Sequence, residues 1–490
     1  MKTALLTLAA FAIPFFSPCQ EVKCKSSEKM AAEIEKYGTA PVESTSYSDQ
    51  KKDLKSQNRE YVSGNCEELY VIPVVFHVFK DGGSAVVPMA QIQSALDALN
   101  RDYNLENSDT SLIDPLFFDL KSKVNFKFTL AQLDPLGNPT SGVNYYPTDS
   151  GFGLTTMDAT IASYAWDNYK YVNVYVMRDL YADGIHNNSG VAWYPYTSMS
   201  DAGTARIVYN DWYLGDYGLG TSIADAEFES VFTHEFGHFF NLIHTFEGGC
   251  TDPNDEVDDT PSTEVAVGCG PSVSSCGHFI NGENYMDYNA SCYRMFTVGQ
   301  TDRVQDALYH PARITLWQKS NLIATGVIDE HPYGSGPYSN MNVSDTLIFE
   351  GDDVTFTDIS CYFAEGRDWT FSGGSPGSST AETVVVNYPT AGVYPAQLIS
   401  NDSYGPGTTA IVNIHVVPLS SAGIDRNSAV KFTFIENYLK TNYDGHVVDL
   451  SGKKVAEYRQ NELTDLNGLP DGVYLLYVPE IGQTVKIIKH

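Results

Sequence analysis

The segment HEFGHFFNLIH, residues 234–244, restricts the fold of this chain more than any other stretch. If the segment is helical, His234 and His238 lie one turn apart on the same face. Two imidazoles in that arrangement can hold one metal ion from one side. Glu235 lies between them in the sequence and can reach a water molecule bound to that ion. The segment therefore predicts a metal site built on a helix.

The third histidine of the segment, His244, lies too far around a continuing helix to bind the same ion easily. It becomes a ligand only if the chain turns sharply after about Phe240. Asn241 follows, and asparagine is, after glycine, among the residues that best tolerate left-handed backbone angles. Three histidine ligands with an open fourth position are typical of a catalytic zinc. The pattern matches the metzincin signature HExxHxxGxxH with Asn241 in place of glycine.

The composition argues against several classes of function. The chain has 490 residues and a formal net charge of −31, from 30 Lys and Arg against 61 Asp and Glu. This acidity argues against binding to nucleic acid and against contact with a membrane through basic residues. Beyond the N-terminus, no run of about twenty apolar residues suggests a membrane span. The length predicts about two to four domains.

The N-terminus predicts export. Residues 1–19 combine a lysine, an apolar run and small residues, which is typical of a secretory signal. We therefore expect a secreted or outer-surface protein, in which disulfides are permissible. The polar residues 20–66 are either a flexible linker or a pro-segment. In the second case Cys24 can occupy the open metal position until the segment is cut away.

A folded domain is predicted for residues 67–330. LYVIPVVFHVFK is a near-continuous apolar run typical of a buried strand, and PMAQIQSALDALNRDYN repeats apolar residues at helical spacing. Further strands are predicted in VNFKFTLA, YVNVYVM and ARIVYND. The helix of the metal site is expected to begin near Asp225. This order predicts an α/β domain with the helix under the sheet.

Four cysteines follow His244 in this exported chain. They predict two disulfides, and their number leaves three pairings open: Cys250, Cys269, Cys276 and Cys292. The loop CTDPNDEVDDTP also groups carboxylates beside Thr260, namely Asp252, Asp255, Asp258 and Asp259. Oxygen ligands in a tight loop suit a hard cation such as calcium. The alternative is a solvated acidic loop, and the EF-hand pattern does not fit.

The motif NYMDY, residues 284–288, comes next. Metzincins carry a methionine turn beneath the zinc, downstream of the third histidine, and Met286 stands at a fitting distance. Tyr288 lies two residues beyond it. A lone methionine is usually core filling, but its place after the histidine motif favours the methionine turn.

Together these segments resemble the pappalysin family of metzincin proteases, including its secreted bacterial branch. The resemblance spans about residues 70–313 and rests on YVIPVVFHVF, IQSALDALNRDYN, YVNVYV, HEFGHFFNLIH, CTDPNDEVDDTP and ENYMDYNASCYRMFTVGQ. It implies an α/β (α+β) metzincin catalytic domain with a twisted mixed sheet and an active-site helix. Relatives that prefer arginine carry an aspartate near residues 289–291, where this chain has none, so an arginine preference is not implied.

The resemblance also implies a role for each site residue. Catalytic zinc is bound by His234, His238 and His244. Glu235 is the general base and acid, Tyr288 steadies the oxyanion, and Met286 forms the methionine turn. The family's pairing implies the disulfides Cys250–Cys276 and Cys269–Cys292. The acidic loop corresponds to the family's calcium-binding region, with candidate ligands Asp252, Asp255, Asp258 and Thr260. Cys24 resembles the family's latency cysteine.

The C-terminal third predicts two all-β, sandwich-like domains. In residues 340–419, VTFTD, WTFSGG and VNYPTAGVY resemble a polycystic-kidney-disease-type (PKD) repeat, which implies a spacer or substrate-binding module. Residues 425–490 resemble the C-terminal sorting domain of type IX secretion substrates, which implies that secretion machinery as a partner; another adhesion-type sandwich is the alternative. Whether Cys361 pairs with Cys66 stays open.

The leading hypothesis is a secreted zinc endopeptidase that is made as a latent zymogen and acts on protein or peptide substrates. A catalytically silent metzincin-like adhesin is the main alternative, and Asn241 is the feature that favours it. A zinc hydrolase that acts on something other than protein is a third reading.

Overall fold

The computed structural model describes residues 69–80, 87–215, 228–251, 255–265, 267–331, 334, 336–362, 364–417, 432–435, 438–462 and 464–489. These residues fall into two units, divided between His331 and Pro332. The predicted signal peptide and pro-segment, with Cys24, lie outside the described residues. So does Cys66. Among the described helices, none is long and apolar enough to cross a membrane.

A mixed sheet forms the centre of the first unit, with strand order β3-β1-β5-β7-β6 and with β4 also paired to β1. The strands are β1 (Tyr70–Phe79), β3 (Phe126–Leu130), β4 (Val143–Tyr146), β5 (Val172–Met177), β6 (Gly190–Ala192) and β7 (Ile207–Asn210). All pairs are parallel except that of β6 with β7, which is antiparallel. Every residue of β1 is buried, as its near-continuous apolar sequence predicts. Every residue of β5 is buried as well. β6 therefore forms one edge of the sheet.

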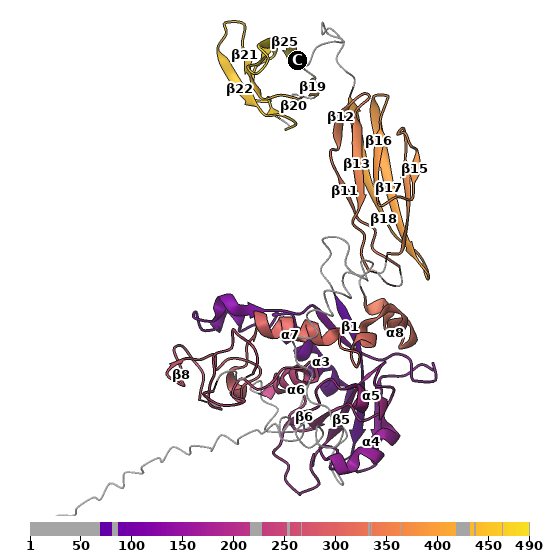
Figure 1. The fold of residues 1–490 in the computed structure, drawn as a ribbon, viewed down its shortest axis with the longest axis vertical. Helices are drawn as coiled ribbons and strands as arrows, with labels where there is room; N and C mark the ends of the chain where they lie inside the picture. The colour runs from indigo at the N-terminus through magenta and orange to yellow at the C-terminus, as the bar shows by residue number, and fades with distance from the viewer. Residues whose placement is uncertain are drawn as a thin grey trace, which may run out of the picture. The chain divides into compact units, whose positions relative to one another are not determined.

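In the described residues, six α-helices surround or flank this sheet (Figure 1). They are α3 (Met89–Tyr103), α4 (Asp158–Tyr164), α5 (Thr197–Asp201), α6 (Val231–Phe239), α7 (Val298–Leu308) and α8 (Lys319–Ala324). Two short strand pairs also belong to this unit. One joins β2 (Lys121–Ser122) to β10 (Phe296–Thr297), and the other joins β8 (Ser274–Ser275) to β9 (His278–Phe279).

The helix of the histidine motif, α6, packs against both α3 and the sheet. The Thr233 hydroxyl donates to Asp102 of α3 at 2.6 Å, and the Phe236 ring lies 4.9 Å from the Phe128 ring of β3. α6 begins at Val231, so the start predicted near Asp225 is wrong. Residues 228–230 form turns instead. The Ser230 side chain bonds to the buried Asp102 carboxylate, which draws the chain towards α3 just before the helix.

The second unit begins with a two-sheet sandwich. One sheet has the order β11-β13-β16 and the other β12-β18-β17-β14-β15. The strands are β11 (Met341–Val343), β12 (Leu347–Phe349), β13 (Asp353–Asp358), β14 (Gly366–Phe371), β15 (Ser378–Ser379), β16 (Thr383–Asn387), β17 (Gly392–Asp402) and β18 (Gly405–Val417). Phe356 of the first sheet and Trp369 and Phe371 of the second share one core. Alternation of buried and exposed residues along β13, β14 and β16 produces this packing.

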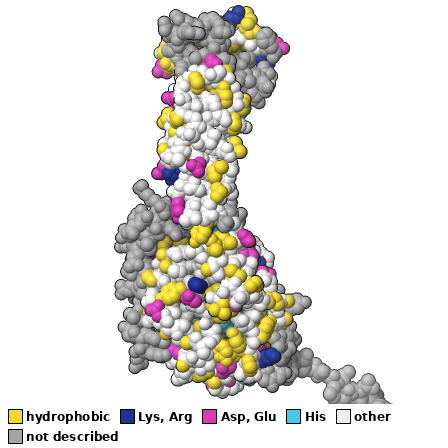
Figure 2. All heavy atoms as spheres, turned by 90° about the vertical axis from the view of Figure 1, so that its right-hand side faces the viewer, with side chains coloured by type: hydrophobic (Ala, Val, Ile, Leu, Met, Phe, Trp, Pro, Cys, Tyr) yellow, Lys and Arg dark blue, Asp and Glu magenta, His cyan; other side chains and the backbone are white. Residues whose placement is uncertain are grey.

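The last strands form two further small sheets, β19-β20-β23 and β22-β21-β24-β25. They are β19 (Phe432–Ile435), β20 (Tyr438–Thr441), β21 (Gly445–Val448), β22 (Lys454–Tyr458), β23 (Thr464–Asp465), β24 (Gly472–Val478) and β25 (Gln483–Lys489). Leu439, Val447 and Leu476 lie in their common core. The C-terminal region is therefore all-β. On the face shown in Figure 2, the few Lys and Arg side chains of the described residues stand apart from one another.

Candidate metal centre

The end of α6 is a Schellman turn, and Asn241 is its left-handed residue. The helix stops at Phe239, and Asn241 has a φ of 73°. Its N–H donates to the His238 carbonyl at 2.9 Å, and the Leu242 N–H donates to the Gly237 carbonyl at 2.8 Å. The chain thus turns after Phe240. The sequence predicted that His244 needs this turn to reach the other two histidines.

The three histidines of the motif meet behind this turn. His238 Nε2 lies 3.1 Å from Nε2 of His234 and 3.1 Å from Nε2 of His244. All three side chains are buried. In the described part of the chain, these three histidines form the group of side chains that can hold a metal ion. Each offers one ligand atom, and these atoms lie within 4.8 Å of one another.

The other nitrogen of each ring faces an acceptor. His234 Nδ1 lies 2.6 Å from the Tyr285 carbonyl, and His238 Nδ1 lies 2.7 Å from the Leu242 carbonyl. His244 Nδ1 lies 3.3 Å from a carboxylate oxygen of Glu247. Because a carbonyl or carboxylate can only accept, these contacts assign the proton to each Nδ1. Each Nε2 then carries a lone pair that points towards the common centre.

Burial keeps the three rings neutral. It lowers the pKa of His234 to about 4, against the raising effect of the hydrogen bond to Tyr285. Burial also holds the pKa of His238 and of His244 well below the ordinary value, and the neighbouring histidines lower it further. Neutral imidazole is the form that binds a metal ion.

This donor set fits zinc. Three unprotonated nitrogens cannot hydrogen-bond to one another, so their convergence in a buried space is unfavourable unless a cation joins them. Three imidazole ligands that leave a fourth position open match the ligand set of a catalytic zinc. The backbone and carboxylate acceptors behind the rings fix their orientation, as acceptors behind metal-binding histidines commonly do.

Glu235 is fully buried in α6 and lies against the edge strand β6. A Cβ atom at Gly190 of β6 would lie 2.6 Å from both Cγ and Oε1 of Glu235. A side chain at that position would displace the carboxylate. Glycine therefore leaves the space that the Glu235 side chain occupies between the helix and the edge strand.

Met286 lies directly beneath α6. A Cβ atom at Gly237 would lie 2.4 Å from the Met286 sulfur, so the missing side chain of Gly237 allows this approach. The Met286 N–H donates to the Asn284 side chain at 2.9 Å, and the Met286 carbonyl accepts from Thr245 at 3.2 Å. The turn at Met286 thus connects to the chain just after His244.

Aromatic rings line the histidine cluster. Tyr288 is half-buried, with its ring centroid 5.0 Å from that of His244 and 5.8 Å from that of His234. Phe246 stacks on His244 at 4.7 Å. Tyr194 packs edge-on against His238 at 5.6 Å. These rings exclude water around the ligands and leave the Tyr288 ring next to the centre.

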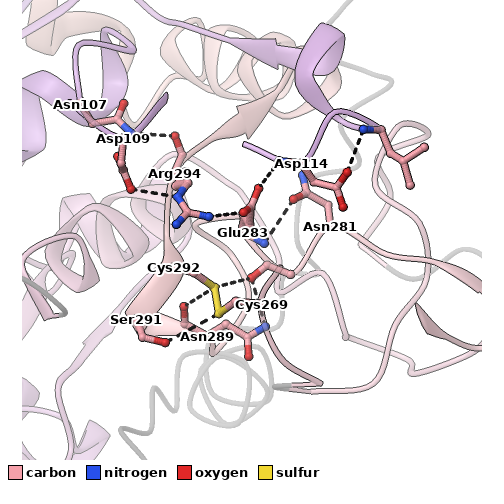
Figure 3. Close-up of polar contacts among 12 residues, drawn as sticks. Asn107, Asp109, Asp114, Cys269, Asn281, Glu283, Asn289, Ser291, Cys292 and Arg294 are labelled. Carbon is pink, nitrogen blue, oxygen red and sulfur yellow. Dashed lines mark hydrogen bonds and ion pairs between the residues drawn. A yellow bond between two sulfur atoms is a disulfide. The ribbon is translucent and has the colours of Figure 1, made fainter. Parts of the chain in front are cut away.

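Two disulfides brace the segment after the motif. They join Cys250 to Cys276 and Cys269 to Cys292, which are the pairs that the family resemblance implied. Figure 3 shows the second pair beside a charged cluster in which Arg294 binds both Asp109 and Glu283.

The same cluster ties the Met286 segment to the region after α3. A Glu283 carboxylate oxygen accepts from the Asp114 N–H at 2.7 Å, and the Asn107 amide donates to the Arg294 carbonyl at 3.0 Å (Figure 3). Residues 283–294, which include Met286 and Tyr288, are therefore held from two sides. Cys361 is also disulfide-bonded.

The acidic loop does not form a comparable ligand group in the described residues, and Asp252 lies outside them. Asp255 is buried and accepts from the Thr260 hydroxyl at 2.7 Å. Burial raises its pKa to about 7. Asp258 is exposed. Asp259 accepts from the Gly299 N–H at 2.9 Å and so caps α7. A calcium ion in this loop stays a prediction.

Sequence reasoning missed several residues of the site. Glu247 follows His244 by three residues, and that spacing was its available signal. The Tyr285 and Leu242 carbonyls carried no signal, because any residue type offers a carbonyl. Tyr194 also gave none, since a tyrosine far along the chain is brought to the site only by the fold.

Comparison with known proteins agrees with this geometry. Residues 155–309 match the Peptidase M43 family, described as pregnancy-associated plasma protein-A. An extracellular metalloprotease of Podospora anserina is 34% identical over 182 residues, which is 36% of this chain and 57% of that protein. One of Neurospora crassa is 35% identical over 147 residues, which is 28% of this chain and 47% of that protein. The chain spans about half the length of these curated relatives.

Solved structures are also similar. Mature mirolysin of Tannerella forsythia, in complex with a cleaved peptide, is 26% identical and covers 53% of this chain and 99% of that chain, with a TM-score of 0.46. A PKD1 domain from a Vibrio cholerae metalloprotease is 25% identical and covers 16% of this chain and 95% of that chain, with a TM-score of 0.14.

The fold and the site define a metzincin-like catalytic unit: a mixed sheet, a helix that carries two histidines, a turn to the third, and a methionine beneath them. The segment that matches the pappalysin-type (Peptidase M43) metalloprotease family, residues 155–309, contains all of these site residues.

Proposed function

We propose that the chain is a secreted zinc-dependent endopeptidase that hydrolyses peptide bonds of extracellular proteins and is made as a latent zymogen. The observation that carries this proposal is the convergence of three neutral histidine nitrogens beside the buried Glu235. The match of residues 155–309 to a metalloprotease family supports it. The curated relatives are named extracellular metalloproteases, which supports an extracellular location.

The residues of the site divide the chemistry among them. Bound zinc would lower the pKa of a water molecule and polarise the scissile carbonyl. Glu235 takes a proton from the attacking water and passes it to the leaving amine. Tyr288, whose ring lies next to His244, donates a hydrogen bond to the oxyanion.

The edge strand β6 supports a peptide as the substrate. It pairs with β7 on one side and stands at the end of the sheet on the other. An extended peptide can add to such an edge through backbone hydrogen bonds. Gly190 of β6 lies directly against Glu235, so a peptide on this edge passes beside the general base.

The remaining parts of the proposal concern segments around the catalytic unit. Cys24 blocks the open metal position until residues 20–66 are removed, and the acidic loop binds calcium as a structural ion. Residues 340–419 act as a PKD-type module and residues 425–490 as a sorting domain read by type IX secretion machinery. The all-β sheets of the second unit are compatible with both modules.

The silent-adhesin alternative loses its supporting feature. Asn241 favoured it as a departure from the glycine of the motif. In the Schellman turn, however, Asn241 adopts the left-handed conformation with both hydrogen bonds of the turn formed.

Casein and gelatin hydrolysis by protein that lacks residues 1–66 tests the function. We expect cleavage that is lost on dialysis against a zinc chelator and restored by stoichiometric zinc. Cleavage that survives complete zinc removal would overturn the proposed chemistry.

A further inference from the structure

Helix α7 connects the acidic loop to the metal centre, although it contributes no ligand. Its first turn has a capping box formed by Thr297 and Gln300. Asp259 of the acidic loop accepts from the Thr297 hydroxyl at 2.6 Å and from the Gly299 N–H at 2.9 Å. The acidic loop therefore fixes where α7 begins.

One side chain of α7, Arg303, reaches the turn between the second and third histidines. Its Nε donates to the Asn241 carbonyl at 2.6 Å. The Arg303 side chain is only 4% exposed. Asn241 is itself buried, so its carbonyl has little access to water as an alternative donor. The guanidinium is the charged donor at this point of the turn.

The position of that carbonyl affects two ligands. Asn241 is the residue with the left-handed φ of 73°, so its peptide orientation sets the direction of the chain towards His244. The next carbonyl, that of Leu242, accepts the Nδ1 proton of His238 at 2.7 Å. A rotation at Asn241 would thus move His244 and the acceptor behind His238 together.

Arg303 also binds the acidic loop. Its Nη1 lies 2.8 Å from Glu256, whose side chain is 48% exposed. A solvent-exposed partner contributes little energy by itself, but it restricts the orientation of the planar guanidinium. Glu256, Arg303 and Asn241 form a continuous polar chain from the acidic loop to the metal turn.

We propose that Arg303 is a positioning residue of the metal centre, which holds the left-handed turn at Asn241 and thereby sets the geometry of His238 and His244. The proposal rests on the metal site of the proposed function. The proposal gives α7 a role in metal affinity. Glu256 then contributes less to metal affinity, because it acts only by orienting the Arg303 guanidinium.

Zinc affinity of the full-length chain tests the proposal directly, by competition with a chromophoric chelator. Arg303→Met keeps the length of the side chain but removes its donors. We expect it to weaken zinc binding by about tenfold to a hundredfold, the usual effect of removing a group that orients metal ligands. Arg303→Lys restores a positive donor without the planar fork, so its loss should be smaller. Glu256→Gln should weaken binding least.

A spectroscopic measurement separates positioning from general destabilisation. In the cobalt-substituted protein, the visible absorption of a four-coordinate site depends on ligand geometry. We expect Arg303→Met to change this spectrum, with a fall in kcat and little change in KM. Arg206→Met is the matched control, because Arg206 is also buried and donates to a carbonyl of another segment, that of Phe152, at 2.9 Å. That control should lower the melting temperature without changing zinc affinity or the cobalt spectrum.

Glycine at the turn provides a further test. Asn241→Gly removes the Cβ atom from a left-handed residue, so in the Arg303→Lys background it should recover part of the lost zinc affinity. If Arg303→Met does not fold, Arg303→Lys decides the outcome. Folded Arg303 variants with wild-type zinc affinity and cobalt spectrum would overturn the proposal, as would an equal loss in Arg206→Met. Wild-type protein that binds zinc but cleaves no protein would instead count against the proposed function alone.

Discussion

Each imidazole of the metal centre is oriented by a group on its far side, and two of those groups are backbone carbonyls. The Tyr285 carbonyl comes from the methionine-turn segment and the Leu242 carbonyl from the Schellman turn. Substituting a side chain cannot remove a carbonyl. The orientation of His234 and His238 is therefore sensitive to backbone position, whereas that of His244 depends on the Glu247 side chain.

Gly190→Ala is predicted to damage catalysis while the metal stays bound. The added Cβ would lie 2.6 Å from the Glu235 side chain, so the carboxylate must move. A displaced general base should lower kcat by about tenfold to a hundredfold, with zinc content unchanged. Gly468→Ala is the control, since a Cβ there meets no heavy atom within 4 Å. Full activity of Gly190→Ala would show that Glu235 can act from another position.

His77 is predicted to make stability depend on pH. Burial lowers its pKa to about 4, against the raising effect of the Asn173 hydrogen bond. In the unfolded chain the pKa is about 6.5. The unfolded state thus binds more protons between these values, so stability is full above about pH 6.5 and falls by on the order of 3 kcal/mol as pH drops towards 4.

His77→Gln provides the comparison for this pH effect, because an amide does not titrate in that range. Urea unfolding at pH 4.5 and pH 7 should show a smaller difference for the variant than for the wild type. Equal differences in the two proteins would mean that His77 is not neutral in the fold.

At the scale of elements, the sequence predicts what depends on local spacing. The apolar run of β1 indicates a buried strand, and β1 is buried. A strand was also predicted where β5 lies. The motif and Asn241 indicate a helix followed by a turn, and both are present. The start of α6 could not be placed, because the bond between Ser230 and Asp102 joins residues far apart in the sequence.

The contribution of α7 was also beyond reach of the sequence. Nothing in its sequence shows that Arg303 meets the Asn241 carbonyl. The acceptor is a backbone atom with no residue preference, and the contact exists only once the chain has folded. Sequence reasoning therefore found the histidines that converge and missed the groups that hold them in place.

Removal of a disulfide tests how the segment after the motif is braced. The Cys250–Cys276 and Cys269–Cys292 pairs span 26 and 23 residues. Loops of this length predict a loss of about 2–4 kcal/mol in the free energy of unfolding for either double Ala variant. Thermal unfolding measures the loss. Only the Cys269/Cys292 variant should also lose zinc affinity, since Cys292 lies in the segment with Met286; identical zinc affinities would contradict this difference.

At the scale of the whole molecule, the chain combines a metzincin-like unit with an all-β unit that contains no described metal cluster. The proposed latency depends on Cys24, which lies outside the described residues. If its thiolate occupies the open metal position, Cys24→Ala should mature faster by self-cleavage than the wild type. A time course on denaturing gels measures this, and Cys24→Ala that matures at the wild-type rate would remove the latency role.

The central claim is that the three histidines hold one zinc ion and that Glu235 uses it to cleave peptide bonds. A peptide-library cleavage profile of matured wild type and Glu235→Ala, with zinc content measured on the same samples, tests it most directly. The account predicts one zinc per chain in both proteins, with cleavage by the wild type alone. Wild-type protein that holds one zinc per chain and cleaves no peptide in a diverse library would contradict it.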